Sequence, residues 1–189
     1  LDGFGALGPK IKSQNINIPG DFSSAAFWIV AVAGKTGLKV EIKDVGLNPK
    51  RIALLEVLKR MGAKIKIKYQ NKNYDPIGTV FVEGSKLRGT VISGDEIPNL
   101  IDELPIIAVA GAIASGKTII KDAEELRFKE SDRIAVMATH LKSFGVKVVE
   151  NNDGMEIDGS NKLISPKKEL DSYGDHRIAM SLAILNRYG

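Results

Sequence analysis

The sequence contains no cysteine and only two histidines, His140 and His176. The absence of cysteine excludes disulfides, thiolate metal sites and a thiol nucleophile, and it is compatible with the reducing cytoplasm. Two histidines are too few for a histidine-rich metal site. The composition therefore favours a cytoplasmic protein and predicts neither a disulfide framework nor a zinc-type centre.

Long apolar runs and a dominant charge of one sign are also missing. The longest apolar segments, residues 25–33 and 104–114, are too short to cross a bilayer, and the first residues lack a signal-peptide pattern. The 27 basic and 23 acidic residues are interspersed, and the net charge is only +4. This balance suits small anionic ligands better than nucleic acid. We expect a soluble protein that binds neither membrane nor nucleic acid.

The apolar pattern predicts an α+β fold. At 189 residues with 43% hydrophobic content, the chain is long enough to bury one core. Apolar residues at helical spacing and strands of alternating polarity divide the chain into segments. We expect helices at 22–33, 50–61, 102–114, 131–144 and 178–185, and strands at 38–43, 64–69, 79–83, 90–93, 118–120, 147–150 and 155–157, with a weaker candidate strand at 10–18.

The order of these segments repeats after about 80 residues. Residues 40–44 (VEIKD) parallel residues 118–122 (TIIKD), and residues 61–64 (MGAK) parallel residues 144–147 (FGVK). We place the repeats at approximately 21–93, 102–170 and 175–189, the last only partial. Residues 1–189 are then one incomplete domain, and the chain is a piece of a longer protein.

A charged stretch at residues 127–133 (RFKESDR) directly precedes an apolar helical pattern. Ser131 or Asp132 is a suitable helix cap, and a helix start with nearby cations is a good site for phosphate or carboxylate. The alternative is a solvated helix end whose charges pair with one another. Residues 111–118 (GAIASGKT) also match the P-loop expression, but a helix precedes them and a strand follows, which is the reverse of the order that a P-loop requires.

Three aspartates, Asp21, Asp102 and Asp175, each precede an apolar helix, and helix capping is a sufficient explanation for all three. Asp102 is distinct because four carboxylates fall within residues 95–103, and such crowding can raise a pKa into a range useful for proton transfer. If helices at equivalent places in a repeat begin on one face of the domain, the charged side chains at their starts converge. That set comprises Asp102, Lys129, Glu130, Arg133 and Arg177.

Five segments together resemble the EPSP synthase family, whose members are 3-phosphoshikimate 1-carboxyvinyltransferases. They are residues 19–26 (PGDFSSAA), 45–49 (VGLNP), 94–98 (GDEIP), 126–133 (LRFKESDR) and 173–180 (YGDHRIAM). The resemblance covers about the C-terminal half of the family's enzyme, without its last strands. It implies two domains, each of three βαβαββ-type units around a pseudo-threefold axis, of which this chain is most of one.

The resemblance also implies an activity in the shikimate pathway, which leads to chorismate and the aromatic amino acids. The enolpyruvyl group of phosphoenolpyruvate is transferred to the 5-hydroxyl of shikimate 3-phosphate, and phosphate is released without a metal or an organic cofactor. By motif, Asp102 accepts the hydroxyl proton and Glu130 is the acid/base at the methylene carbon. Asp102 and Lys129 bind shikimate 3-phosphate, and Arg133 and Arg177 hold phosphoenolpyruvate. We expect the enzyme to be monomeric and this fragment to be inactive without the N-terminal half.

Three alternatives stay open at this point. The related enolpyruvyltransferase that acts on UDP-N-acetylglucosamine shares the fold and the donor, but the motif at residues 129–133 and the lack of cysteine argue against it. A non-catalytic anion- or RNA-binding module is disfavoured by the 6% aromatic content. A purely structural repeat protein leaves the charged helix starts unexplained.

Overall fold

The computed structural model describes residues 8, 13, 15–71, 75–160 and 162–189. The helices are α1 (Phe22–Ala33), α2 (Ala53–Arg60), α3 (Leu104–Ala112), α4 (Arg133–Ser143) and α5 (His176–Leu185), with two 3-10 helices, η2 (Gly94–Asn99) and η3 (Glu124–Phe128). The strands are β1 (Lys39–Gly46), β2 (Lys64–Asn71), β3 (Ile77–Glu83), β4 (Val91–Ile92), β5 (Lys117–Ile120), β6 (Lys147–Asn151) and β7 (Gly154–Asp158). The chain is therefore α+β, as the sequence pattern predicted.

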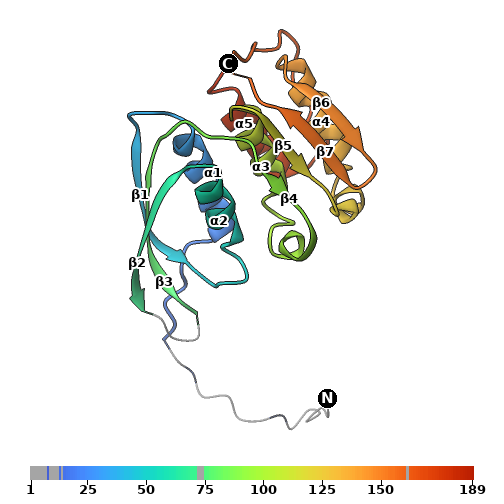
Figure 1. Ribbon diagram of the computed structural model, residues 1–189. Coiled ribbons are helices and arrows are strands. Elements are labelled where there is room, and N and C mark those ends of the chain that lie inside the picture. The colour runs from blue at the N-terminus through green and yellow to red at the C-terminus, as the bar shows by residue number, and fades with distance from the viewer. Residues whose placement is uncertain (1–7, 9–12, 14, 72–74, 161) are drawn as a thin grey trace.

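Two separate sheets lie at opposite sides of the molecule, with helices between them (Figure 1). One sheet has the strand order β1-β3-β2, and the other has the order β4-β5-β7-β6. Every residue of α3 is buried, and this helix contacts α1, α4 and α5. A helix that is apolar on all sides belongs in a protein interior, and α3 is accordingly the centre of the core.

Local geometry recurs where the sequence repeats. Asp44, at the irregularity in the register of β1, and Asp122, just after β5, both adopt a positive φ, of 56° and 61°. Gly62 and Gly145, which follow α2 and α4, have φ values of 99° and 81°, a region that suits a residue without a Cβ atom. The two aligned segments of the sequence thus turn in the same way in the structure.

Three helices begin later than we predicted. The helix expected from residue 131 starts at Arg133, because Asp132 is its N-cap. The helix expected from Lys50 starts at Ala53, because Asn48 forms a turn in which its backbone oxygen accepts hydrogen bonds from the amides of Arg51 and Ile52. The helix expected from Asp102 starts at Leu104, because a separate turn ends there. In that turn the backbone oxygen of Leu100 accepts from two successive amides.

The strand predicted at residues 90–93 is β4, which is two residues long. It pairs in parallel with β5 and is an edge strand of the second sheet. The corresponding place beside β1 holds a parallel bridge between Gly20 and Val45. Much of the candidate strand at 10–18 lies outside the described residues, and residues 15–18 are not in a strand. The boundaries of the repeats stay a prediction.

Candidate active site

The charged stretch of residues 127–133 ends in a capped helix. Asp132 is the N-cap of α4, and its side chain accepts a hydrogen bond from the amide of Ala135 at 3.0 Å. Arg127 Nη1 binds the Asp132 carboxylate at 2.8 Å, and its other nitrogens hold the end of β6. Arg127 therefore fixes the start of α4 to the sheet. The residues that follow it in the stretch contribute to the site.

Arg133, the first residue of α4, is 1% exposed, although it carries a charge. Its Nε donates to Asp175 Oδ2 at 2.8 Å, and its Nη2 donates to Glu130 Oε2 at 2.6 Å. Its Nη1 lies 3.9 Å from Asp102 Oδ1 and has no hydrogen-bond partner among the described residues. A buried N–H group without a partner is costly, and it is a ready donor for an anion that enters the site.

Asp175 is fully buried and has two roles. As the N-cap of α5 it accepts hydrogen bonds from the backbone amides of Arg177 and Ile178. It also binds Arg133 and accepts a hydrogen bond from Ser131. Burial alone would raise the pKa of Asp175, but the hydrogen bond and charge of Arg133, together with the other donors, lower it below its usual value. Asp175 is therefore an anion at neutral pH, and it holds α4 against α5.

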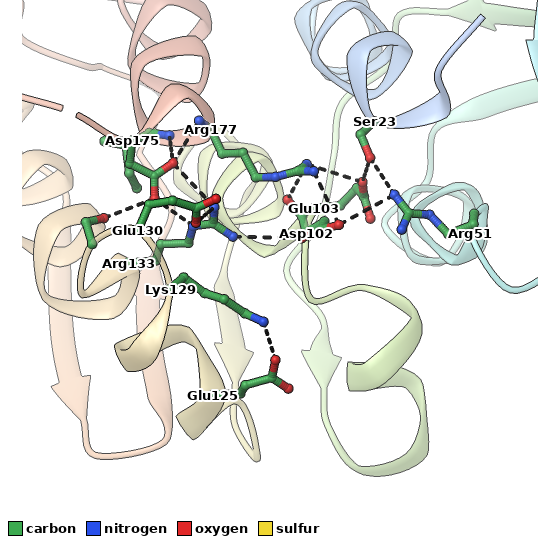
Figure 2. A network of polar contacts seen from close by, with 12 residues as sticks. Ser23, Arg51, Asp102, Glu103, Glu125, Lys129, Glu130, Arg133, Asp175 and Arg177 are labelled. Carbon is green, nitrogen blue, oxygen red and sulfur yellow. Dashed lines mark hydrogen bonds and ion pairs between the residues drawn. The ribbon is translucent and has the colours of Figure 1, made fainter. Parts of the chain in front are cut away.

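Arg177 projects from the first turn of α5 toward the beginning of α3 (Figure 2). Its Nη2 lies 3.2 Å from Asp102 Oδ2, and its Nη1 donates to the backbone oxygen of Asp102 at 3.1 Å. The same Nη1 lies 3.8 Å from Glu103 Oε1. Arg133 and Arg177 thus approach one carboxylate, that of Asp102, from two different helices.

Asp102 is not a helix cap. The N-cap of α3 is Glu103, which makes no side-chain capping bond. The raised pKa that we expected from crowded carboxylates belongs to Glu103, and burial is its largest cause, with the charge of Asp102 a lesser one. Crowding is weaker than the sequence suggested because Glu96 turns away and pairs with Arg60.

Three members of the site were not predicted from the sequence. Ser23 Oγ, in the first turn of α1, donates to Glu103 Oε1 at 2.5 Å. Arg51 Nη2 donates to Ser23 Oγ at 2.9 Å and lies 3.5 Å from Asp102 Oδ2. Glu103 appeared only as one of the crowded carboxylates. The hydrogen bond between Ser23 and Glu103 joins residues 80 positions apart along the chain, and no local sequence pattern indicates it.

Lys129 occupies a different place from the other four predicted residues. It is paired with Glu125, whereas Asp102, Glu130, Arg133 and Arg177 are joined by contacts around Asp102 (Figure 2). Lys129 lies beside this group, and its side chain points toward Glu125. The structure thus brings four of the five together. The chemistry available there is proton transfer by carboxylates beside guanidinium groups that bind an anion.

Two further features concern only the part of the chain that the structure describes. No helix in it is long and apolar enough to cross a membrane. No three side chains among its histidines, aspartates and glutamates are grouped so as to hold a metal ion.

Residues 6–187 match the family model of EPSP synthase, described as 3-phosphoshikimate 1-carboxyvinyltransferase. The chain belongs to the EPSP synthase family. The 3-phosphoshikimate 1-carboxyvinyltransferase of Crocosphaera subtropica is 51% identical over 93% of this chain and 39% of its own length. That of Oenococcus oeni is 47% identical over 93% of the chain and 40% of its own length. The chain thus spans about two fifths of the curated relatives that it matches.

Solved structures show the same fold. The EPSP synthase of Acinetobacter baumannii superposes with a TM-score of 0.87 at 39% identity, over 96% of this chain and 42% of that one. The enolpyruvyl transferase NikO of Streptomyces tendae superposes with a TM-score of 0.70 at 19% identity, over 90% of this chain and 37% of that one, and this likeness concerns the fold alone. The α+β architecture is therefore that of the enolpyruvyl transferases. Membership in the EPSP synthase family favours the resemblance found in the sequence over the three alternatives considered there.

Proposed function

We propose that this chain forms part of a 3-phosphoshikimate 1-carboxyvinyltransferase. The reaction joins phosphoenolpyruvate to the 5-hydroxyl of shikimate 3-phosphate and releases inorganic phosphate. The observation that carries the proposal is the buried Arg133. Its Nη1 has no hydrogen-bond partner among the described residues and faces Asp102, while Glu130 and Arg177 lie beside it. The names of the relatives support the choice of substrates.

In the proposed mechanism Asp102 takes the proton of the attacking hydroxyl. The hydroxyl oxygen forms a bond to the central carbon of phosphoenolpyruvate, and Glu130 delivers a proton to the methylene carbon, which becomes a methyl group. In the second step Glu130 takes a proton back from that methyl group, the double bond re-forms, and the bond from the central carbon to the phosphate oxygen breaks as Asp102 returns its proton to the departing phosphate. Each proton has a carboxylate that gives or accepts it.

Arg133 and Arg177 hold phosphoenolpyruvate in this proposal. A planar guanidinium binds a carboxylate or phosphate through two parallel N–H bonds, and both arginines already lie at the edge of a carboxylate cluster. Lys129 binds shikimate 3-phosphate after it leaves Glu125. No cofactor takes part. We also propose that the complete enzyme is a cytoplasmic monomer, in which the rest of the chain supplies the remaining contacts to both substrates.

The test requires a complete enzyme. We define the completed enzyme as this chain joined to the portion of the Crocosphaera subtropica relative that it does not match. We expect the completed enzyme to release phosphate from the two substrates and the 189-residue chain alone to be inactive. Turnover by the isolated chain would contradict the second expectation, and an inactive completed enzyme would contradict the proposed function.

Asp102→Ala in the completed enzyme should lower kcat by about 10²- to 10⁴-fold, the usual contribution of a general base. Asp95→Ala is the matched control, because it removes an exposed carboxylate from the same stretch of sequence, on η2. Steady-state phosphate release measures both. An unchanged rate in Asp102→Ala would remove this residue from the mechanism.

A further inference from the structure

Asp102 is held by side chains rather than by a helix end. Because Glu103 is the N-cap of α3, the Asp102 carboxylate lies outside the helix and makes no capping bond to its amides. Its Oδ2 lies between Arg177 Nη2 at 3.2 Å and Arg51 Nη2 at 3.5 Å. These two guanidiniums come from opposite sides of the carboxylate (Figure 2).

Arg51 is itself fixed by a chain of hydrogen bonds that begins at a buried carboxylate. Glu103 is 2% exposed, and its Oε1 accepts the only hydroxyl proton of Ser23. The Ser23 oxygen is then left to act as an acceptor, and Arg51 Nη2 donates to it at 2.9 Å. The direction of each bond is set by the one before it, so the guanidinium has a defined place although its side chain is 49% exposed.

We propose that Arg51 is a positioning residue that orients the Asp102 carboxylate for proton abstraction, and that Ser23 and Glu103 hold it in place. Arg133 and Arg177 attract the same carboxylate from the opposite side, which is the side assigned to the anionic substrate. Arg51 prevents Asp102 from turning fully toward those two arginines and occupying Arg133 Nη1, which has no hydrogen-bond partner among the described residues. The inference rests on the proposed function, since it concerns the base of that reaction.

Removal of Arg51 should reduce kcat more than it changes substrate binding. In the completed enzyme, Arg51→Ala should lower kcat by about 100-fold, the cost of misplacing a reacting group by about 1 Å. The KM for each substrate should change by less than about threefold, since orientation of the base acts in the transition state. Arg51→Lys should recover a substantial part of kcat, because a cation remains beside Asp102, although it lacks the fork that also reaches Ser23.

Lys50→Ala is the matched control. Lys50 is the neighbouring exposed cation, and its removal changes the net charge by the same amount without an ion pair to Asp102. Its kcat should stay within about twofold of the parent value, as expected for a surface substitution. Arg51→Ala should leave the midpoint of thermal unfolding nearly unchanged. An Arg51→Ala enzyme with full kcat would overturn the inference, as would a loss of kcat that accompanies unfolding and is not recovered by lysine.

A crystal structure of the Arg51→Ala variant provides a readout that does not depend on activity. We expect the Asp102 carboxylate to turn toward Arg177 and Arg133, with its distances below the present 3.2 Å and 3.9 Å. An Asp102 carboxylate in its original position would refute the positioning role even if the completed enzyme had no activity. Inactivity of the unmodified completed enzyme, by contrast, bears on the proposed function alone.

Discussion

The starts of α1 and α5 use the same residue for the same local purpose, with different results. Asp21 and Asp175 are both N-caps in extended backbone geometry, and each accepts a hydrogen bond from an amide of its helix. Asp21 is exposed, and its carboxylate accepts hydrogen bonds from the amide and hydroxyl of Ser24. Asp175 is fully buried, and its second oxygen binds Arg133.

The difference shows that a capping aspartate becomes part of a site through its partner on another element. The capping bond is a local property of the chain, and it is available to both residues. The ion pair with Arg133 requires that α4 and α5 lie side by side. The residue type and its position in the helix are equal in the two cases, so the neighbouring helix decides the outcome.

The largest effect expected from this comparison is on stability. Asp175→Ala leaves the buried Arg133 without its main counter-charge, and the free energy of unfolding should fall by about 3–5 kcal/mol. Asp21→Ala removes only a cap and should cost about 1 kcal/mol. Urea denaturation of both variants, followed by circular dichroism, measures the two values. Equal losses would show that the ion pair contributes nothing beyond the cap.

The pH dependence sharpens the same comparison. The pKa of Asp175 in the folded chain lies below its ordinary value of 3.8, so its ionised form stabilises the fold above that value. This contribution is lost as the pH falls through the lowered pKa. The difference in unfolding free energy between the parent chain and Asp175→Asn should therefore be constant near neutral pH and shrink below about pH 4. A constant difference down to the acid limit would contradict the lowered pKa.

The smallest expected change in the free energy of unfolding concerns Glu103, at the start of α3, and there the substitution should stabilise the fold. Burial raises the pKa of Glu103 above 4.5, so its ionised form destabilises the fold at neutral pH. Glu103→Gln keeps an oxygen that accepts from Ser23, and it should raise the free energy of unfolding by less than about 1 kcal/mol at neutral pH. The gain should decrease as the pH falls toward 4.5, where the parent glutamate takes up a proton. Urea denaturation of both proteins at several pH values measures this gain in unfolding free energy. A gain that grew at low pH would be inconsistent with a raised pKa of Glu103.

Local chemistry made much of this structure predictable. The bounds of α1 follow from a capping residue before an apolar helical pattern, and they are confirmed. The cap of α4, predicted as Ser131 or Asp132, is Asp132. The α+β class was predicted from the same kind of local pattern, and it is also confirmed. The start of α3 was wrong by two residues, since a turn and a helix begin with similar sequences. The sheet to which β4 belongs was not predicted, because pairing between strands is not recorded in the order of segments.

The site was predictable only in part, for a related reason. The resemblance to family motifs identified four residues of the site, because each lies in or beside a motif that can be recognised in the sequence. They are Asp102, Glu130, Arg133 and Arg177. Their catalytic and binding roles stay proposals. Ser23 and Arg51 belong to α1 and to the loop before α2, and only the docking of these segments against α3 brings them to Asp102. Periodicity and capping carry no information about such docking.

The contacts of the cluster join residues 42, 75 and 80 positions apart. Contacts of such long range form late when a chain folds, because large loops must close before they are made. A half-folded molecule therefore has no site, and a ligand that binds there recognises only the fully assembled domain. By mass action such a ligand stabilises every helix that contributes a side chain, however far that helix lies from the ligand along the chain.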